Sequence, residues 1–140
     1  MRNGVRMISV VMGCQNGKRR FDEAARLLSL GFSQYKLVRF LEKGAPAAQA
    51  VPVLGGEKKD TVLTAAAEFV AAVKPADQPK VERKESLCPY LPAPVAPGTP
   101  CGKVSFVIGE RELGAVDMIT AESIPALSLT GKILRRLYLK

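Results

Sequence analysis

From residue 33 onward, glycine and proline divide the sequence into short runs of β-forming residues. Such runs, spaced at near-regular intervals and bounded by turn residues, are typical of small antiparallel β domains. The 12 glycines and 10 prolines among 140 residues also argue against a helical bundle. We therefore predict a mainly β fold, either a small sandwich or a small barrel, and favour a small antiparallel β-sandwich at residues 33–125. Strands are expected at residues 35–42, 47–54, 60–64, 68–73, 80–87, 103–108 and 112–119.

Five prolines lie within residues 89–100, before the last two predicted strands. Because proline has no N–H to donate, this segment is predicted to be an extended edge or a loop, never a central strand. We expect residues 93–104 to form an ordered crossing into the final hairpin, with Gly98 and Gly102 supplying conformations that side chains would forbid. Val104, Phe106 and Ile108 should point into the core, because side chains alternate along a strand.

The N-terminal part predicts one strand and one helix. Residues 5–12, from Val5 to Met12, are apolar on both faces except for Arg6 and Ser9, as in a buried central strand. A strand with unpaired edges is a template for another chain. We therefore expect the segment to be disordered, to dock on the β domain or to drive self-association by strand pairing. A helix should follow at residues 18–30, with Gly31 ending it as a left-handed residue.

Helical periodicity returns at residues 128–140, which we predict to form a short amphipathic helix. Each basic residue near an anionic membrane contributes about 1 kcal/mol, so the four basic residues of this helix would contribute roughly 4 kcal/mol. A helix whose apolar stripe simply packs on the β domain is the alternative. The candidate membrane-binding residues are Lys132, Ile133, Leu134, Arg135, Arg136, Leu137, Tyr138 and Lys140.

Composition and charge restrict the chemistry. The chain has no histidine, which removes histidine-dependent catalysis and imidazole zinc sites, and we expect no catalytic residue, metal or cofactor. The net charge of +8 suits a polyanion or a membrane surface. We expect no nucleic-acid partner, because zinc-finger spacing and basic runs interleaved with aromatic residues are both missing. Cys14, Cys88 and Cys101 lack CxxC spacing. Cys88 and Cys101 could pair across the proline-rich loop, but we prefer to interpret them as two small apolar residues at strand ends.

Short motifs along the whole chain resemble one family, the serine D-alanyl-D-alanine carboxypeptidases, which are low-molecular-weight penicillin-binding proteins that trim the stem peptides of bacterial peptidoglycan. The N-terminal motifs are residues 2–13, Arg20-Phe21, Leu27-Leu28 and Gly31-Phe32. The later motifs are Val51-Pro52-Val53, Gly55-Gly56, Val62-Leu63, Ala93-Pro94-Val95, Gly98, Gly102-Lys103-Val104, Gly109, Leu113-Gly114 and Ala121-Glu122. The resemblance implies that residues 1–32 are the closing strand and helix of the family's catalytic domain. It also implies a C-terminal β domain at residues 33–125 and an amphipathic anchor at residues 126–140.

The family's catalytic motifs, SxxK, SxN and KTG, would all precede the strand with which this chain begins. Ser33-Gln34-Tyr35-Lys36 satisfies SxxK, but Ser33 follows a predicted helix end, whereas this nucleophile needs a helix start that places the lysine one turn above it. SxN is missing, and Leu129-Thr130-Gly131 lacks the lysine of KTG. We therefore expect the chain to be inactive alone, although the family is one of serine peptidases.

The function that we favour is a non-catalytic stalk, the membrane-proximal C-terminal domain of a D-Ala-D-Ala carboxypeptidase in peptidoglycan remodelling. Its expected place is the outer face of the bacterial cytoplasmic membrane. Its expected partners are the membrane surface, the missing catalytic domain and, through the strand from Val5 to Met12, a second copy. Two alternatives stay open: an active hydrolase that uses Ser33 or Cys14, and a basic adaptor module that binds an anionic polymer or a partner protein.

Overall fold

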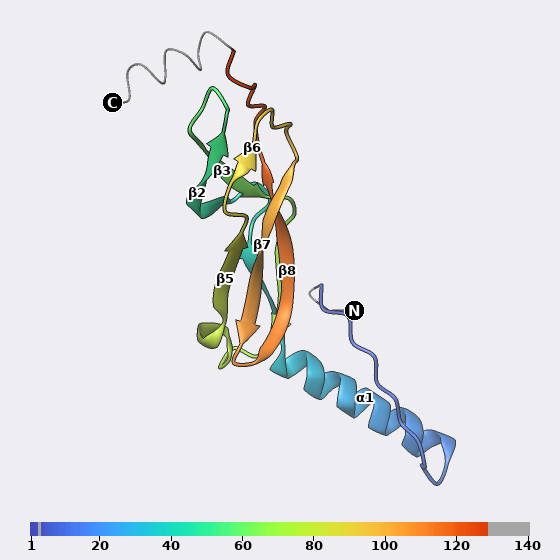
Figure 1. Cartoon of the computed structure of the whole chain (residues 1–140). Helices are drawn as coiled ribbons and strands as arrows, with labels where there is room; N and C mark the ends of the chain where they lie inside the picture. Colours follow the sequence, from blue (N-terminus) through green and yellow to red (C-terminus); the bar gives the residue numbers. More distant parts are fainter. Residues whose placement is uncertain (3, 129–140) are drawn as a thin grey trace. The chain divides into compact units, whose positions relative to one another are not determined.

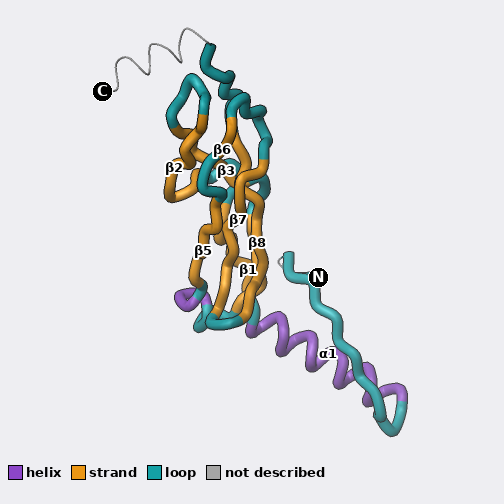
Figure 2. The backbone as a smooth tube through the Cα atoms, viewed as in Figure 1, coloured by secondary structure: helices purple, strands orange, loops and turns teal. Residues whose placement is uncertain are grey.

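The structure is a computed structural model that describes residues 1–2 and 4–128. It divides into two compact units. Unit 1 contains Met1–Phe40 and Val70–Val81, and unit 2 contains Leu41–Phe69 and the described residues from Glu82 onward. The chain is mainly β, as predicted: one α-helix precedes the strands (Figures 1 and 2). No helix among the described residues is both long enough and apolar enough to cross a membrane.

Helix α1 spans Gly17–Gln34. Asn16 caps its N-terminus, because the Asn16 side chain accepts a hydrogen bond from the backbone N–H of Arg19 at 2.9 Å. The predicted end at Gly31 is wrong, since the helix continues to Gln34. A Cβ at Gly31 would collide with the Sδ atom of Met7. Gly31 therefore permits close packing of the N-terminal segment on the helix and does not end the helix.

The strand predicted at residues 5–12 is not formed. In this part of the chain the described residues contain only an isolated bridge between Arg2 and Val5. The extended segment lies against α1, and the Ser9 hydroxyl donates a hydrogen bond to the carbonyl of Ala24 at 3.5 Å (Figure 1). The outer face of the segment is uncovered: Ile8, Val10 and Met12 are 79%, 76% and 87% exposed. A helix covers one face of an extended segment but cannot supply the edge hydrogen bonds of a neighbouring strand, which is why no strand forms.

Strands β1 (Lys36–Leu41) and β4 (Phe69–Val73) form a two-stranded sheet. A short 3₁₀-helix at Gln78–Lys80 follows β4, so the strand predicted from residue 80 begins only at Glu82. The Nζ atom of Lys80 lies 2.9 Å from the carboxylate of Asp77.

Six strands form one sheet in the order β5-β7-β8-β3-β2-β6. Their bounds are Pro46–Leu54 for β2, Asp60–Ala65 for β3, Glu82–Leu87 for β5, Leu91–Pro92 for β6, Pro100–Ile108 for β7 and Arg111–Thr120 for β8. Neighbouring strands are antiparallel except β2 and β6, which are parallel. β7 and β8 form the long hairpin beside β5 (Figure 1).

The predicted β-sandwich is not observed, because these strands belong to one continuous sheet that curls on itself. Glu85 of β5 contacts Ala48 of β2, although three strands separate β5 from β2 in the sheet. A curled sheet buries apolar side chains on its own concave face and needs no second sheet above it. The most deeply buried apolar residues of unit 2 include Leu63, Val104, Phe106, Met118 and Ile124.

Most of the proline-rich segment lies at the sheet edge, as predicted, where β6 pairs with β2. Its last residue departs from the prediction, because Pro100 begins β7, which lies between β5 and β8 and starts three residues earlier than expected. Gly98 and Gly102 have φ of +79° and +119°, conformations that side chains disfavour. Thr120, at the end of β8, is buried, and its side chain forms two hydrogen bonds to the backbone of the proline-rich segment. Its Oγ1 donates to the carbonyl of Ala96 at 2.6 Å and accepts from the backbone N–H of Thr99 at 3.0 Å.

Cys88 and Cys101 form a disulfide, with their Cα atoms 5.2 Å apart. The preferred sequence interpretation, two unpaired apolar residues, is therefore wrong. The pairing follows from the ladder, because the N–H of Cys88 donates to the carbonyl of Cys101 at 3.1 Å where β5 lies beside β7. Val104 and Phe106 are buried as predicted, and Ile108, the last residue of β7, is half-buried.

Candidate functional site

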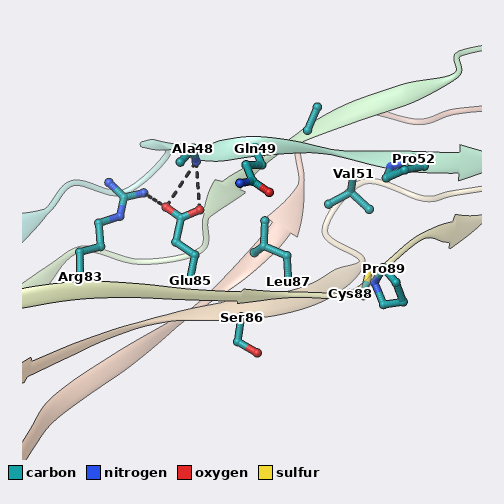
Figure 3. A pocket seen from close by; sticks show the side chains of 11 residues that line it. Ala48, Gln49, Val51, Pro52, Arg83, Glu85, Ser86, Leu87, Cys88 and Pro89 are labelled. Carbon is teal, nitrogen blue, oxygen red and sulfur yellow. Dashed lines mark hydrogen bonds and ion pairs between the residues drawn. The ribbon is translucent and has the colours of Figure 1, made fainter.

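A groove of about 730 Å³ lies between the facing edges of β2 and β5 in unit 2 (Figure 3). Residues 48–52 of β2 line one side. The other side is lined by Arg83 and residues 85–87 of β5, together with Cys88 and Pro89 just after it. The curl of the sheet creates this groove, because it brings two strands that do not pair with each other to opposite sides of one space. Cavities of 300–1,000 Å³ are typical of binding sites.

One end of the groove is closed by side chains that take the place of a neighbouring strand. The carboxylate of Glu85 accepts the backbone N–H of Ala48 at 3.0 and 3.3 Å. The guanidinium of Arg83 donates to the carbonyl of Pro46 at 3.3 Å and also pairs with Glu85. We call this arrangement the Arg83–Glu85 clasp. It satisfies backbone groups of β2 that no strand of unit 2 pairs at this point.

Beyond the clasp, backbone groups of β2 face the groove. The N–H of Val53 donates to the carbonyl of Lys59 on the β3 side at 2.8 Å. The carbonyl of Leu54 accepts from Ala93 on the opposite side at 2.9 Å. Because the direction of backbone groups alternates along a strand, Ala50 and Pro52 direct theirs away from β3. The parallel pairing of β2 with β6 uses the carbonyl of Pro52 to accept the N–H of Leu91, so the open edge offers the N–H and the carbonyl of Ala50.

The β5 side presents the complementary edge. The N–H of Cys88 points toward β7, so the alternation directs the N–H and carbonyl of Leu87 away from β7 and toward the groove. Figure 3 shows the side chains of Gln49, Val51 and Leu87 directed into the space between the strands and Ser86 on the other side of β5. The groove thus combines backbone donors and acceptors with two apolar side chains and one amide.

The candidate catalytic residues of the sequence lie elsewhere, in unit 1. Ser33 is in the last turn of α1, and its hydroxyl donates to the carbonyl of Leu30 at 2.8 Å. Lys36 begins β1, so it does not stand one helical turn above Ser33. The two residues line a cavity of about 470 Å³ but belong to different elements. Cys14 is a half-buried free thiol in the turn before α1.

The candidate membrane-binding residues, 132–138 and 140, lie outside the described residues. Among the ionisable groups, Asp77 has a lowered pKa because the Lys80 ammonium donates a hydrogen bond to it and adds a favourable charge interaction. This pair lies in unit 1, whereas the groove residues belong to unit 2.

Sequence reasoning missed the groove. Its residues lie in two predicted strands, but the contact between them depends on how strongly the whole sheet curls. The one available signal was a pair of opposite charges at alternate positions of β5, Arg83 and Glu85, which is also what an ordinary exposed strand would show.

Comparison with known proteins places this architecture in a family. Residues 35–126 match the family model described as penicillin-binding protein 5, C-terminal domain. The chain is 26% identical over 132 residues to the D-alanyl-D-alanine carboxypeptidase DacA of Haemophilus influenzae, covering 94% of this chain and 33% of the relative. It is 26% identical over 129 residues to DacD of Escherichia coli, covering 91% and 33%. The chain thus spans about a third of the length of these relatives.

Solved structures show the same fold. Penicillin binding protein 5 from Haemophilus influenzae matches with a TM-score of 0.65 and 24% identity, over 77% of this chain and 31% of the other. The PBP3 of Streptococcus pneumoniae, titled a peptidoglycan synthesis regulatory factor, matches with a TM-score of 0.63 and 17% identity, over 75% and 31%. The family model covers more than half of the chain and includes every strand of the curled sheet. The chain therefore belongs to the family of penicillin-binding protein 5 C-terminal domains.

Proposed function

We propose that this chain is the non-catalytic C-terminal domain of a D-Ala-D-Ala carboxypeptidase that acts in peptidoglycan remodelling, and that it positions a catalytic domain at its substrate. The match of residues 35–126 to the family model carries this proposal. The relatives are D-alanyl-D-alanine carboxypeptidases of about three times the matched length. The arrangement of Ser33 and Lys36, one in a helix end and one in a strand, supports a positioning role over a catalytic one.

Labelling with a penicillin tests this proposal. The purified chain should remain unlabelled when incubated with excess penicillin and measured by intact mass, and it should release no D-alanine from a D-Ala-D-Ala peptide. Stoichiometric labelling would refute the non-catalytic assignment. In that event the Ser33→Ala variant identifies whether Ser33 is the nucleophile.

The proposed location is the outer face of the cytoplasmic membrane. The Cys88–Cys101 disulfide supports an oxidising compartment, where such bonds persist. We propose that residues 132–138 and 140 bind anionic lipid, on the basis of their basic and apolar sequence pattern. Co-sedimentation with anionic liposomes should weaken when residues 128–140 are deleted or when salt is raised. Binding that is unaffected by both changes would exclude this segment as the anchor.

The N-terminal segment is proposed to contact a further protein domain. Its uncovered face, with Ile8, Val10 and Met12, suits burial against a catalytic domain or strand pairing with a second copy. Light scattering should show self-association that the Val10→Lys variant reduces. A strictly monomeric chain at high concentration would remove the second-copy arrangement and leave the catalytic domain as the proposed partner.

A further inference from the structure

We propose that the groove between β2 and β5 binds a short, uncharged, extended peptide segment of a partner protein, which adds to the open edge of β2. This inference goes beyond the positioning role and does not depend on the carboxypeptidase assignment. It rests on the backbone groups that face the groove, on the Arg83–Glu85 clasp and on the limits of the open edge.

The clasp shows what kind of ligand this edge accepts. At Ala48 the edge N–H already bonds to a carboxylate oxygen, and at Pro46 the edge carbonyl already bonds to a guanidinium nitrogen. These two side-chain groups occupy the acceptor and donor positions that a neighbouring strand would fill. At Ala50 the same edge continues into the groove, so its N–H and its carbonyl require the same two kinds of partner. A peptide backbone in an extended conformation supplies both kinds of partner.

The length of the open edge limits the peptide. The clasp covers β2 up to Ala48, and the pairing with β6 begins at the carbonyl of Pro52. The three residues between these points span about 10 Å at about 3.3 Å per residue, which accommodates a segment of about three residues. The groove volume of about 730 Å³ leaves room for its side chains.

The lining determines the character of the peptide. Arg83 and Glu85 neutralise each other, and the remaining lining side chains are uncharged, so a neutral segment fits better than a charged one. Val51 is 2% exposed and forms an apolar floor, and Leu87 faces it from β5 (Figure 3). A side chain of the peptide that points inward should therefore be apolar, such as valine. The Gln49 amide can bond to the outer carbonyls of the peptide.

The test uses NMR titration of the full chain with a neutral β-forming probe, the acetylated and amidated pentapeptide threonine-valine-threonine-valine-threonine. Amide signals of Ala50 and Leu87 should shift more than those of strand β8, which lies on the far side of β7. The same peptide with every backbone N–H methylated keeps its side chains but cannot donate, so it should lose binding. A version with glutamate at both valine positions should bind about tenfold more weakly.

Two protein variants complete the design. Ala50→Pro removes the N–H that faces the groove but no bond to β3, since proline is tolerated where the N–H faces an open edge. It should weaken binding about tenfold, whereas the matched control Ala50→Ser keeps the N–H and should bind about as well as the wild type. Should Ala50→Pro fail to fold, the N-methylated peptide on wild-type protein decides the matter. The proposal would be overturned if the unmodified and N-methylated peptides bound equally well, or if Ala50→Pro and Ala50→Ser bound the peptide equally well. It would also be overturned by signal shifts confined to another surface, or by no binding up to about 5 mM peptide.

Discussion

Gly102 is the position where a single added methyl group should cost the most stability. Its φ of +119° is one that residues with a side chain rarely adopt, and it lies opposite Leu87 in the β5–β7 ladder. A Cβ built at Gly102 would lie 2.6 Å from the Cα of Leu87 and would collide with the carbonyl oxygen of Ser86. Both contacts are backbone of a paired strand, so neither can move without disturbing the ladder.

The expected cost of Gly102→Ala has two parts. The unfavourable φ contributes about 1–3 kcal/mol. The collision with β5 contributes about 1–3 kcal/mol more, as overpacking of a close-packed contact does. Gly98→Ala is the matched control, because Gly98 has φ of +79° but nothing lies within 4 Å of the position that its Cβ would take. Gly98→Ala therefore carries a backbone part but no collision, and the difference between the two variants contains the collision together with the greater backbone penalty at +119°.

Thermal unfolding followed by far-ultraviolet circular dichroism measures this difference. For a domain of this size a loss of about 1 kcal/mol lowers Tm by roughly 4–8 °C, so Gly102→Ala should melt roughly 8–16 °C below Gly98→Ala for a difference of about 2 kcal/mol. Urea unfolding should give the same order of stabilities. Equal Tm values for the two variants would refute the argument, since the ladder would then have moved apart at no measurable cost.

Three other measurements test the structure. Thr120→Val should lower the free energy of unfolding by about 2 kcal/mol, because the buried hydroxyl bonds to a carbonyl and an N–H of the proline-rich segment; an unchanged stability would show that these groups find water instead. Replacing Cys88 and Cys101 together by serine should cost about 3 kcal/mol, as expected for a closed loop of about 15 residues, and the reduced wild type should match the double variant. The carboxylate of Asp77 should titrate below its ordinary pKa by NMR, and Lys80→Met should return it. Because the folded-state pKa of Asp77 is lowered, the Asp77–Lys80 pair stabilises the protein at neutral pH and loses its effect as the pH falls through that pKa. If Asp77 titrated identically in the Lys80→Met variant, the pairing would be contradicted.

The sequence alone determined where most strands lie, because β-forming runs and the glycines and prolines between them are local signals. Most of the proline-rich segment could be placed at an edge because proline has no N–H to donate, although Pro100 begins the interior strand β7. The alternation in residues 5–12 is also a local signal, but the sequence predicts that both faces are buried, whereas Ile8, Val10 and Met12 are exposed in the structure. What the sequence could not show was whether a partner strand lies beside that segment.

Only the tertiary structure decided the features that depend on two distant segments meeting. In the sequence, Gly31 indicated a helix end, because glycine is the residue most often found just after a helix. In the structure, the side chain of Met7 occupies the space that a Cβ at position 31 would need. The structure has a single curled sheet in place of the predicted sandwich, because the hydrogen-bond ladder is continuous from β5 to β6. The groove and the Arg83–Glu85 clasp follow from that curl. The spacing between the edges of β2 and β5 is the sum of small twists over all the strands between them, and no local run of residues encodes such a sum.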